Sequence, residues 1–302
     1  MERKGLSNKK TKDLIFCLLI LAIPMIQFAI FYIGVNVNSF VMVFQRYEVD
    51  SETLKGAYVF NGLKNFSSMF NQITGEGIFL GAIKNSLISF VMITLVGITF
   101  SLVFSLYIFK KLPAAGVFRV LLFAPSILSA VVTVTMFKYF VEGAIPEIFD
   151  MKFGLLGNAD TKFATIIFYN VWIGFGTQVL MYSGAMSGID PSIMEAARLD
   201  GASPVREFFS VILPLIFPTV QTFLVTGVAT ILINQINLVA FDGLWASPQY
   251  MTVGYYLFSK AEAATSYELP VLATYGVTLT LIAAPLTLLT RWVLDKFGPS
   301  VE

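Results

Sequence analysis

Long apolar runs constrain this chain more strongly than any other feature of its sequence. The run from Leu14 to Phe44 contains no charged residue, and later runs also approach or exceed the roughly 20 residues that a helix needs to cross a bilayer. With 302 residues, of which 56% are hydrophobic and only 13% charged, the composition excludes an ordinary soluble domain. We therefore predict an all-α integral membrane protein that forms a single transmembrane domain over residues 1–302.

Polar segments between these runs divide the chain into about six transmembrane helices. The first run follows a basic N-terminus, but it is too long for a signal peptide and no small-x-small cleavage site closes it, so we interpret it as a span. Ala124-Pro125-Ser126 is expected to interrupt the third span, residues 65–70 to form a short interfacial helix, and residues 239–269 to be partly re-entrant. The predicted spans are residues 14–44, 85–109, 117–139, 163–186, 215–238 and 271–294.

The basic residues indicate how these helices are oriented. If the N-terminus is cytoplasmic, most of the 20 Lys and Arg residues fall on the cytoplasmic side, although its segments are shorter than the outer loops. This is the bias that positive charge shows for the cytoplasmic face of a membrane. Both termini and the polar segment 187–214 are therefore expected in the cytosol. The basic residues on this side are Arg3, Lys4, Lys9, Lys10, Lys12, Lys110, Lys111, Arg119, Arg198, Arg206, Arg291 and Lys296.

Residue types that carry most enzymatic chemistry are missing. The chain has no histidine, and Cys17 is its only cysteine, so it lacks the commonest general base and any cysteine-rich metal site. It contains no Gly-x-x-x-x-Gly-Lys-Ser/Thr phosphate loop, and its net charge of +1 argues against a nucleic-acid partner. We expect no catalytic residue, no metal site and no cofactor bound by this chain.

The segment 187–214 contains the longest charged and polar interruption in the second half of the chain, and it predicts two short helices around a turn. Asp190 or Ser192 can cap the first helix, and Ser192 with Glu195 fits a capping box. Gly201 is expected to end that helix because glycine adopts a positive φ angle without steric strain. A helix–turn–helix between two spans offers a rigid projection to a partner in the cytosol.

The same segment carries a spaced motif. It runs Glu-Ala-Ala, three residues, Gly, nine residues, an aliphatic residue and then Leu-Pro. This pattern resembles the EAA loop in the membrane-spanning subunits of binding-protein-dependent ABC importers. Asp190-Pro191 and residues 200–204 resemble the carbohydrate-importing, maltose-permease branch, and the resemblance extends from about Ser39 to Phe297. Val211 stands where that family usually has Ile. The matching residues are Glu195, Ala196, Ala197, Gly201, Val211, Leu213 and Pro214.

The resemblance implies a permease subunit that forms half of the translocation pathway for a sugar or oligosaccharide. ATP and Mg would be bound by a separate ATPase dimer, on which the loop would dock. The resemblance also implies a second, similar permease subunit, expected as a heterodimer, and an extracytoplasmic solute-binding protein that lands on loops 45–84, 142–162 and 239–269. The location would be the plasma membrane of a bacterium or archaeon, in contact with lipid. The residues implied in coupling are Glu195, Ala196, Ala197, Asp200, Gly201, Leu213 and Pro214.

Polar side chains that recur within the spans indicate where a solute would pass, because polar groups that face lipid are costly. In the fourth and fifth spans they recur every four residues and so share one face of a helix. Uncharged amides and hydroxyls, mixed with aromatic rings, suit a neutral, hydroxyl-rich solute. The alternative is that these groups, the threonines above all, bond neighbouring helices. The predicted pathway residues are Asn170, Gln178, Tyr182, Thr226, Thr230, Asn234 and Tyr275.

Other functions stay open at this point. The same machine is compatible with import of another small solute, such as a polyamine or a glycerol phosphate ester, although the absence of acidic residues inside the spans argues against polyamines. A self-contained secondary transporter would usually need an intramembrane carboxylate or other ion site, which the span interiors lack. An intramembrane enzyme would need a nucleophile with its base, or paired carboxylates, at membrane depth.

Overall fold

The computed structural model describes residues 2–52 and 55–299, most of them in helices. Helices long and apolar enough to cross a membrane cover Lys12–Met42, Ile78–Phe109, Ala159–Ser187, Pro204–Thr230 and Leu269–Phe297. A sixth candidate is a broken pair, Ala115–Ile127 and Ala130–Phe149, whose axes bend by 110°. These helices confirm the prediction of a mainly helical membrane protein with about six spans.

The chain divides into two compact units. Unit 1 contains Met1–Gln72 and Ala263–Thr278, and unit 2 contains Ile73–Glu262 and Leu279–Glu302. The predicted description of the chain as one transmembrane domain is not tested by this division and stays a prediction.

Unit 1 begins with one long helix and continues into a hairpin. The helix comprises α1 (Glu2–Gln27), the wider turns of η1 (Phe28–Gly34) and α2 (Val35–Met42). From Lys12 to Met42 no side chain of this helix is buried. Because it is apolar on all sides, lipid or another protein must cover it. The antiparallel strands β1 (Gln45–Val49) and β2 (Gly56–Phe60) follow, then α3 (Lys64–Glu76). The sequence analysis predicted the short helix here but no strand.

Asn65 explains how the hairpin and α3 are held to the end of the first helix. Its side-chain nitrogen donates to the carbonyl oxygens of Val43 and Gln45, at 2.7 Å each, and Asn65 is buried. These two carbonyls lie where α2 ends and β1 begins, so one amide satisfies backbone groups that neither element pairs.

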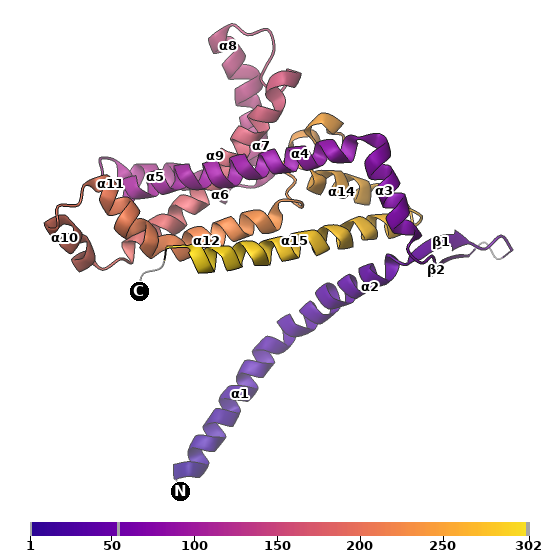
Figure 1. Cartoon of the computed structure of the whole chain (residues 1–302), viewed down its shortest axis with the longest axis horizontal. Coiled ribbons are helices and arrows are strands. Elements are labelled where there is room, and N and C mark those ends of the chain that lie inside the picture. Colours follow the sequence, from indigo (N-terminus) through magenta and orange to yellow (C-terminus); the bar gives the residue numbers. More distant parts are fainter. Residues whose placement is uncertain (1, 53–54, 300–302) are drawn as a thin grey trace. The chain divides into compact units, whose positions relative to one another are not determined.

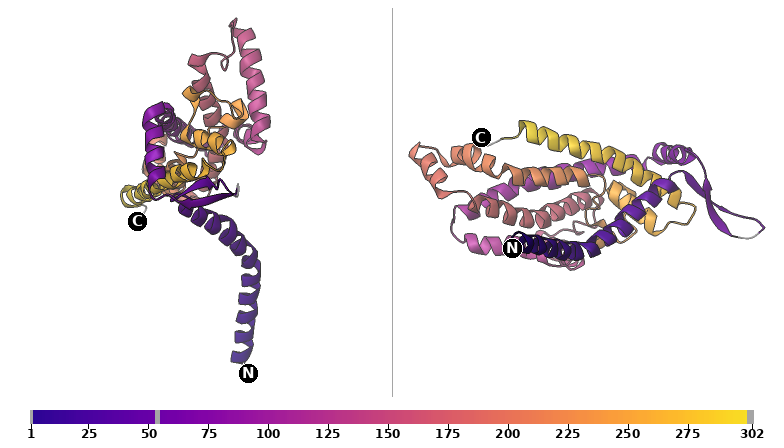
Figure 2. Two further views of the ribbon diagram at one scale, coloured as in Figure 1. Left: turned by 90° about the vertical axis from the view of Figure 1, so that its right-hand side faces the viewer. Right: turned by 90° about the horizontal axis from the view of Figure 1, so that it is seen from below.

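Unit 2 contains the remaining elements and is organised around α9 (Ala159–Ser187), which packs against α5, α6 and α12. The loop helix α10 lies at one end of the unit and α14 lies toward the other, as two perpendicular views agree (Figures 1 and 2). The elements before α9 are α4 (Ile78–Phe90), η2 (Val91–Val96), α5 (Gly97–Phe109), α6 (Ala115–Ile127), α7 (Ala130–Tyr139), η3 (Phe140–Ala144) and α8 (Ile145–Phe149). Those after it are α10 (Pro191–Leu199), α11 (Pro204–Glu207), η4 (Phe208–Ile212), α12 (Leu213–Thr230), α13 (Leu238–Asp242), η5 (Pro248–Tyr250), α14 (Val253–Glu262) and the second half of α15 (Leu269–Phe297).

Small and hydroxylated residues allow the neighbours of α9 to approach it closely. A side chain at Gly176 would collide with the carbonyl oxygen of Leu122, so glycine is required where α6 crosses α9. On α5, Ser105 Oγ donates to the carbonyl oxygen of Val179 at 3.1 Å, and Ser101 Oγ lies 2.9 Å from Gln178 Oε1. Hydroxyl-to-backbone bonds of this kind join helices in membrane bundles.

Two predicted spans differ from the structure in ways that matter for function. The third is interrupted at Leu128-Ser129, just after the predicted break around Pro125, and the helix continues to Phe149 where a loop was predicted. The fifth ends at Thr230 instead of Leu238, and a helix could not reach Leu238 because Ile236 and Asn237 adopt positive φ angles that no helix accommodates.

The second span begins at Ile78, seven residues before the predicted start at Asn85. The polar residue Asn85 predicts a boundary in the sequence, but in the structure it is buried within protein. Its side-chain nitrogen donates to the carbonyl oxygens of Gln249 and Met251, at 2.9 Å each. A polar residue whose side-chain nitrogen is paired in this way need not end a span.

Two hydrophobic clusters form the core of unit 2. We call the first the loop cluster; it lies beside the segment 187–214, and its buried members are Ile98, Tyr182, Met186, Met194, Ile212, Ile216 and Val220. We call the second the break cluster, because it surrounds the place where α12 ends; its buried members are Val134, Phe137, Val141, Ile166, Ile167, Tyr169, Ile236, Leu238, Phe241, Ala246, Tyr250 and Tyr255.

Candidate functional site

The segment 187–214 has the helix–turn–helix geometry that its sequence predicts. Asp190 caps α10 by accepting a hydrogen bond from the Ser192 backbone nitrogen at 2.9 Å, and Gly201 has a φ of +72° in the turn. Ser203 caps α11 through the Arg206 nitrogen. The predicted capping box between Ser192 and Glu195 is wrong, because the helix begins at Pro191 and both residues lie inside it.

Hydrogen bonds from Ser192 to Asp190 also affect the ionisation of this cap. They hold the pKa of the Asp190 carboxyl below its ordinary value, because the backbone N–H and the hydroxyl both stabilise the charged form. The first helix of the loop is therefore best capped when Asp190 is ionised.

Helix α10 has one buried anchor and one exposed face. Met194 is only 5% exposed and packs in the loop cluster, whereas Leu199 is 88% exposed. Glu195 and Ala196 are also exposed, and within the part of the chain that the structure describes Glu195 has no ion-pair partner. Apolar residues this exposed beside an unpaired carboxylate indicate a surface that a partner covers.

The other residues implied in coupling take up the turn and its exit. Asp200 and Gly201 are exposed in the turn, Ala197 is half-buried, and Leu213 and Pro214 are half-buried at the start of α12. Proline is tolerated there because the preceding turns of η4 are wide and its missing N–H falls near the helix start.

Glu207 is the residue of this segment that the sequence analysis missed. It is 3% exposed, and its Oε2 accepts from Lys110 Nζ at 2.6 Å, while Arg198 lies 3.7 Å from its Oε1. The signal in the sequence was a lone carboxylate between Phe208 and a basic residue, directly before a span.

A second polar site lies where α12 ends, and Asn170 organises it. Asn170 is 6% exposed, and its side-chain nitrogen donates to the carbonyl oxygens of Ile166 and Ile236 at 2.8 Å. Its side-chain oxygen accepts from Asn237 Nδ2 at 2.7 Å. Asn234 completes the turn by accepting from the Ile236 backbone nitrogen at 2.8 Å. The chain is thus fixed in a break that exposes polar groups.

An open cavity of about 590 Å³ lies at this break. In the described chain, the side-chain nitrogen of Asn234 and the side chain of Gln235 make no hydrogen bond there. Among the residues that the structure describes, none that lines the cavity is charged. Its lining is Ala130, Val131, Thr230, Ile233, Asn234, Gln235, Ile236, Asn237, Val239 and Ala240.

The seven predicted pathway residues take different positions. Thr230 and Asn234 line the cavity, and Thr226 is exposed one turn before it. Asn170 does not line it but holds the break in place. Gln178 lies half-buried against Ser101 of α5.

Two of the predicted pathway residues, both tyrosines, are inaccessible in this conformation. Tyr182 is fully buried in the loop cluster, with its ring against Phe223. Tyr275 is 2% exposed in unit 1, and its hydroxyl lies 3.4 Å from the carbonyl oxygen of Met69. The contribution of all seven residues to solute passage stays a prediction.

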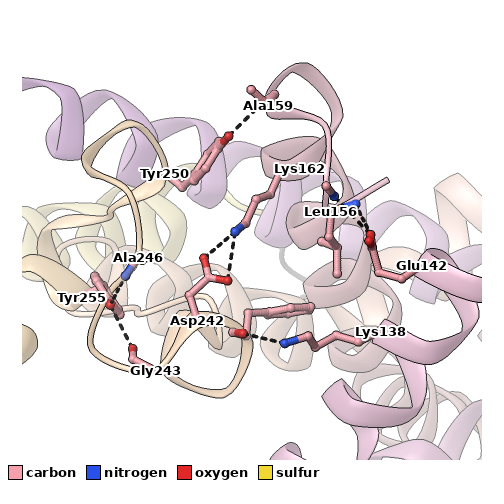
Figure 3. Close-up of polar contacts among 12 residues, drawn as sticks. Lys138, Glu142, Leu156, Ala159, Lys162, Asp242, Gly243, Ala246, Tyr250 and Tyr255 are labelled. Carbon is pink, nitrogen blue, oxygen red and sulfur yellow. Dashed lines mark hydrogen bonds and ion pairs between the residues drawn. The ribbon is translucent and has the colours of Figure 1, made fainter. Parts of the chain in front are cut away.

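The turn after α13 is held by charged and aromatic residues, which Figure 3 shows. Lys162 pairs with Asp242 at 2.8 Å, and Lys138 Nζ donates to the Phe241 carbonyl oxygen at 2.9 Å. The Tyr255 hydroxyl bridges the turn, accepting from Ala246 N and donating to Gly243 O, at 2.9 Å each. The turn is therefore fixed, and Trp245 within it is 91% exposed.

Comparison with protein families gives a match over residues 97–302, to the family described as binding-protein-dependent transport system inner membrane component. The matched stretch begins at α5 and includes both the segment 187–214 and the cavity.

Individual relatives are permease proteins. Over 190 residues the chain is 30% identical to a probable ABC transporter permease protein of Mycoplasma pneumoniae, covering 60% of this chain and 54% of that protein. Over 194 residues it is 27% identical to the maltose/maltodextrin transport system permease protein MalF of Escherichia coli K12, covering 60% and 37%. Over 193 residues it is 24% identical to the multiple sugar-binding transport system permease protein MsmF of Streptococcus mutans, covering 62% and 63%. The chain thus spans less than two thirds of these relatives.

Two solved structures have the same fold. One is a bacterial ABC transporter involved in the import of the acidic polysaccharide alginate, with a TM-score of 0.75, 20% identity and coverage of 97% of this chain and 99% of that chain. The other is the alginate transporter in complex with an alginate pentasaccharide-bound periplasmic protein, with a TM-score of 0.77, 18% identity and the same coverage. At these identities the likeness establishes the fold alone. Because the family match covers well over half of its length, this chain belongs to the inner membrane components of binding-protein-dependent transport systems.

Proposed function

We propose that this chain is one permease subunit of an ATP-driven importer and lines half of the pathway for a neutral sugar or oligosaccharide. The observation that carries this proposal is the pairing of two features in unit 2, an exposed docking helix at one end and an uncharged polar cavity elsewhere. Membership of the family supports it, as do the sugar permeases among the relatives.

The docking helix is α10, and its partner is an ATPase subunit. The exposed Leu199 would enter an apolar groove of that subunit, and Glu195 would meet a basic or polar group at its rim. ATP and Mg belong to the ATPase, because this chain has no phosphate-binding loop. Closure of an ATPase pair would then favour one state of the permease through differential contact with α10.

The cavity favours a neutral solute. Asn234, Gln235 and Thr230 offer amide and hydroxyl groups that bond sugar hydroxyls, and no Lys or Arg is present to select an acidic saccharide. Relatives of similar sequence are named for maltose, maltodextrin and multiple sugars, whereas the structural neighbours import an acidic one. A polyamine or a glycerol phosphate ester would need charged groups in the lining.

Membership of the family supports the remaining parts of the proposed machine. We place a second, different permease subunit beside this one, an ATPase dimer on the cytosolic side, and a solute-binding protein against the outer loops, where Trp245 is exposed. Both termini and α10 are then cytosolic, and the membrane is the plasma membrane of a bacterium or archaeon.

The experiment begins with mass spectrometry of what co-purifies with the tagged chain in mild detergent, followed by reconstitution of the complex in vesicles. We expect an ATPase and a second permease, and ATP-dependent uptake of a maltodextrin in preference to alginate oligomers or spermidine. A chain that purifies alone and moves solute without ATP would overturn the proposal.

Two variants test the loop within that system. Glu195→Lys and Gly201→Asp should leave the chain inserted but lower ATP-driven uptake about tenfold, within the usual range of allosteric coupling. The matched control is Asp13→Lys, because Asp13 is also an exposed acidic residue but lies on α1, outside the loop and outside the predicted outer loops. Normal uptake with either loop variant would contradict the docking of α10.

A further inference from the structure

Glu207 joins three segments through one carboxylate. It ends α11, its Oε2 bonds Lys110 at the C-terminal end of α5, and its Oε1 faces Arg198 of α10. In the described chain no other ion pair links the loop to a span. The loop continues covalently into α9 at one end and into α12 at the other, Met194 packs in the loop cluster, and this ion pair is the loop's charged connection to α5.

Burial makes the ion pair between Glu207 and Lys110 difficult to separate. Glu207 is 3% exposed and the Lys110 side chain is 22% exposed, so solvent screens the pair poorly. A buried carboxylate without its partner is strongly unfavourable, which means that the two groups move together or not at all.

From Lys110 the contacts continue to the polar break. Helix α5 is bonded along α9 through Ser101 and Ser105, and α9 carries Asn170, which holds Ile236 and so the end of α12. Helix α12 is thus attached at both ends to the pair α5–α9, by Glu207 before its start and by Asn170 after its end.

We propose that Glu207 is a positioning residue that makes α5–α9 and α12 move as one body when the loop is displaced. This inference rests on the proposed coupling of the loop to an ATPase. Without the ion pair, only apolar packing would hold the loop to α5, and a displacement of α10 would bend η4 and α12 more than it moves α5. ATP hydrolysis would continue, but the cavity would not change its access.

The test measures solute transported per ATP hydrolysed by the full reconstituted complex. Glu207→Lys and Lys110→Glu should each lower this ratio about tenfold, within the typical range of coupling free energies. The charge-exchanged double variant should recover most of it, because the opposite charges face each other again. Lys111→Glu is the control, since this neighbour is exposed and has no ion-pair partner in the described chain.

A wild-type ratio in either single variant would overturn the proposal, as would a double variant that is no better than the singles. Should a single charge reversal fail to assemble, the near-isosteric Glu207→Gln and Lys110→Met replace it, and a normal ratio there overturns the proposal equally.

A second measurement needs no ATPase. Spin labels on Leu112→Cys and Val205→Cys, in a Cys17→Ser background, report the distance between the end of α5 and α11. We expect one narrow distribution of label-to-label distances in the chain that carries no further change and a broad distribution in Glu207→Lys. The distribution should become narrow again when Glu207→Lys is combined with Lys110→Glu. An unchanged distribution in Glu207→Lys would overturn the inference, whereas a wild-type complex without ATP-driven transport would overturn the proposed function.

Discussion

Two buried polar side chains hold opposite ends of α12, and they do so with different chemistry. Before its start, Glu207 uses a charge and is paired with Lys110 at 2.6 Å. After its end, Asn170 uses a neutral amide and bonds Ile236 and Asn237. A charge is tolerated at the loop end because its partner is also a charge and water is close. Beside the uncharged cavity, a buried charge would have no partner of opposite charge.

The largest loss of stability is expected from breaking the ion pair between Glu207 and Lys110. Lys110→Ala should lower the free energy of unfolding by about 3–5 kcal/mol, the usual cost of leaving a buried charge unpaired, because Glu207 stays buried without Lys110. Removing both charges in Glu207→Ala with Lys110→Ala should cost clearly less, since no orphan charge remains. Thermal unfolding of the purified chain, followed by tryptophan fluorescence, measures both; a double variant as unstable as the single one would contradict the comparison.

A smaller loss of stability is expected from removing the hydrogen bonds of Asn170. Asn170→Leu keeps the size of the side chain but leaves the Ile236 carbonyl and the Asn237 amide unpaired, at about 1–3 kcal/mol per buried group. Hydrogen exchange should rise in residues 231–238 and stay unchanged in residues 191–207, because Asn170 and Glu207 contact different residues. The control is Asn36→Leu, which changes an exposed asparagine of unit 1. Faster exchange at both ends would show that they are one unit.

The smallest expected effect is a difference between the loop and the broken end of α12 in how hydrogen exchange responds to pH. The pKa of Asp190 is lowered on folding, so its stabilisation of α10 is present above the ordinary pKa of about 3.9 and is lost as pH falls through the lower, folded value. Hydrogen exchange of residues 191–198, corrected for the intrinsic rate, should therefore rise in acid, while residues 231–238 respond little.

Asp190→Asn provides the control for this pH response, since asparagine caps a helix without titrating. The loop also contains Glu195, Asp200 and Glu207, so an acid response that persists in Asp190→Asn would assign it to one of these carboxylates instead.

The local features of the loop could be predicted because they depend on neighbours in the sequence. Asp190, Gly201 and Ser203 each act within a few residues, through capping and a positive φ angle. The length of each apolar run likewise depends only on contiguous residues, so the spans could be predicted approximately. The hairpin at Gln45–Phe60 was missed, because its short strands alternate too weakly to stand out from a polar loop.

The pathway residues show the limit of such reasoning. A repeat of four residues places Asn170, Gln178 and Tyr182 on one face of α9, but it does not say what that face meets. In the structure that face meets the broken end of α12, the serines of α5 and the loop cluster in turn.

The sequence by itself determined the class of the protein, the approximate spans and the presence of a helix–turn–helix loop, because bilayer thickness and helix capping act on contiguous residues. Only the tertiary structure decided where α12 breaks, which amides stay free in the cavity and that Glu207 is paired with Lys110. A buried polar group needs a hydrogen-bond or ion-pair partner, and here each partner lies in a different element, tens of residues away in the chain. The sequence does not show which of these distant residues are brought together.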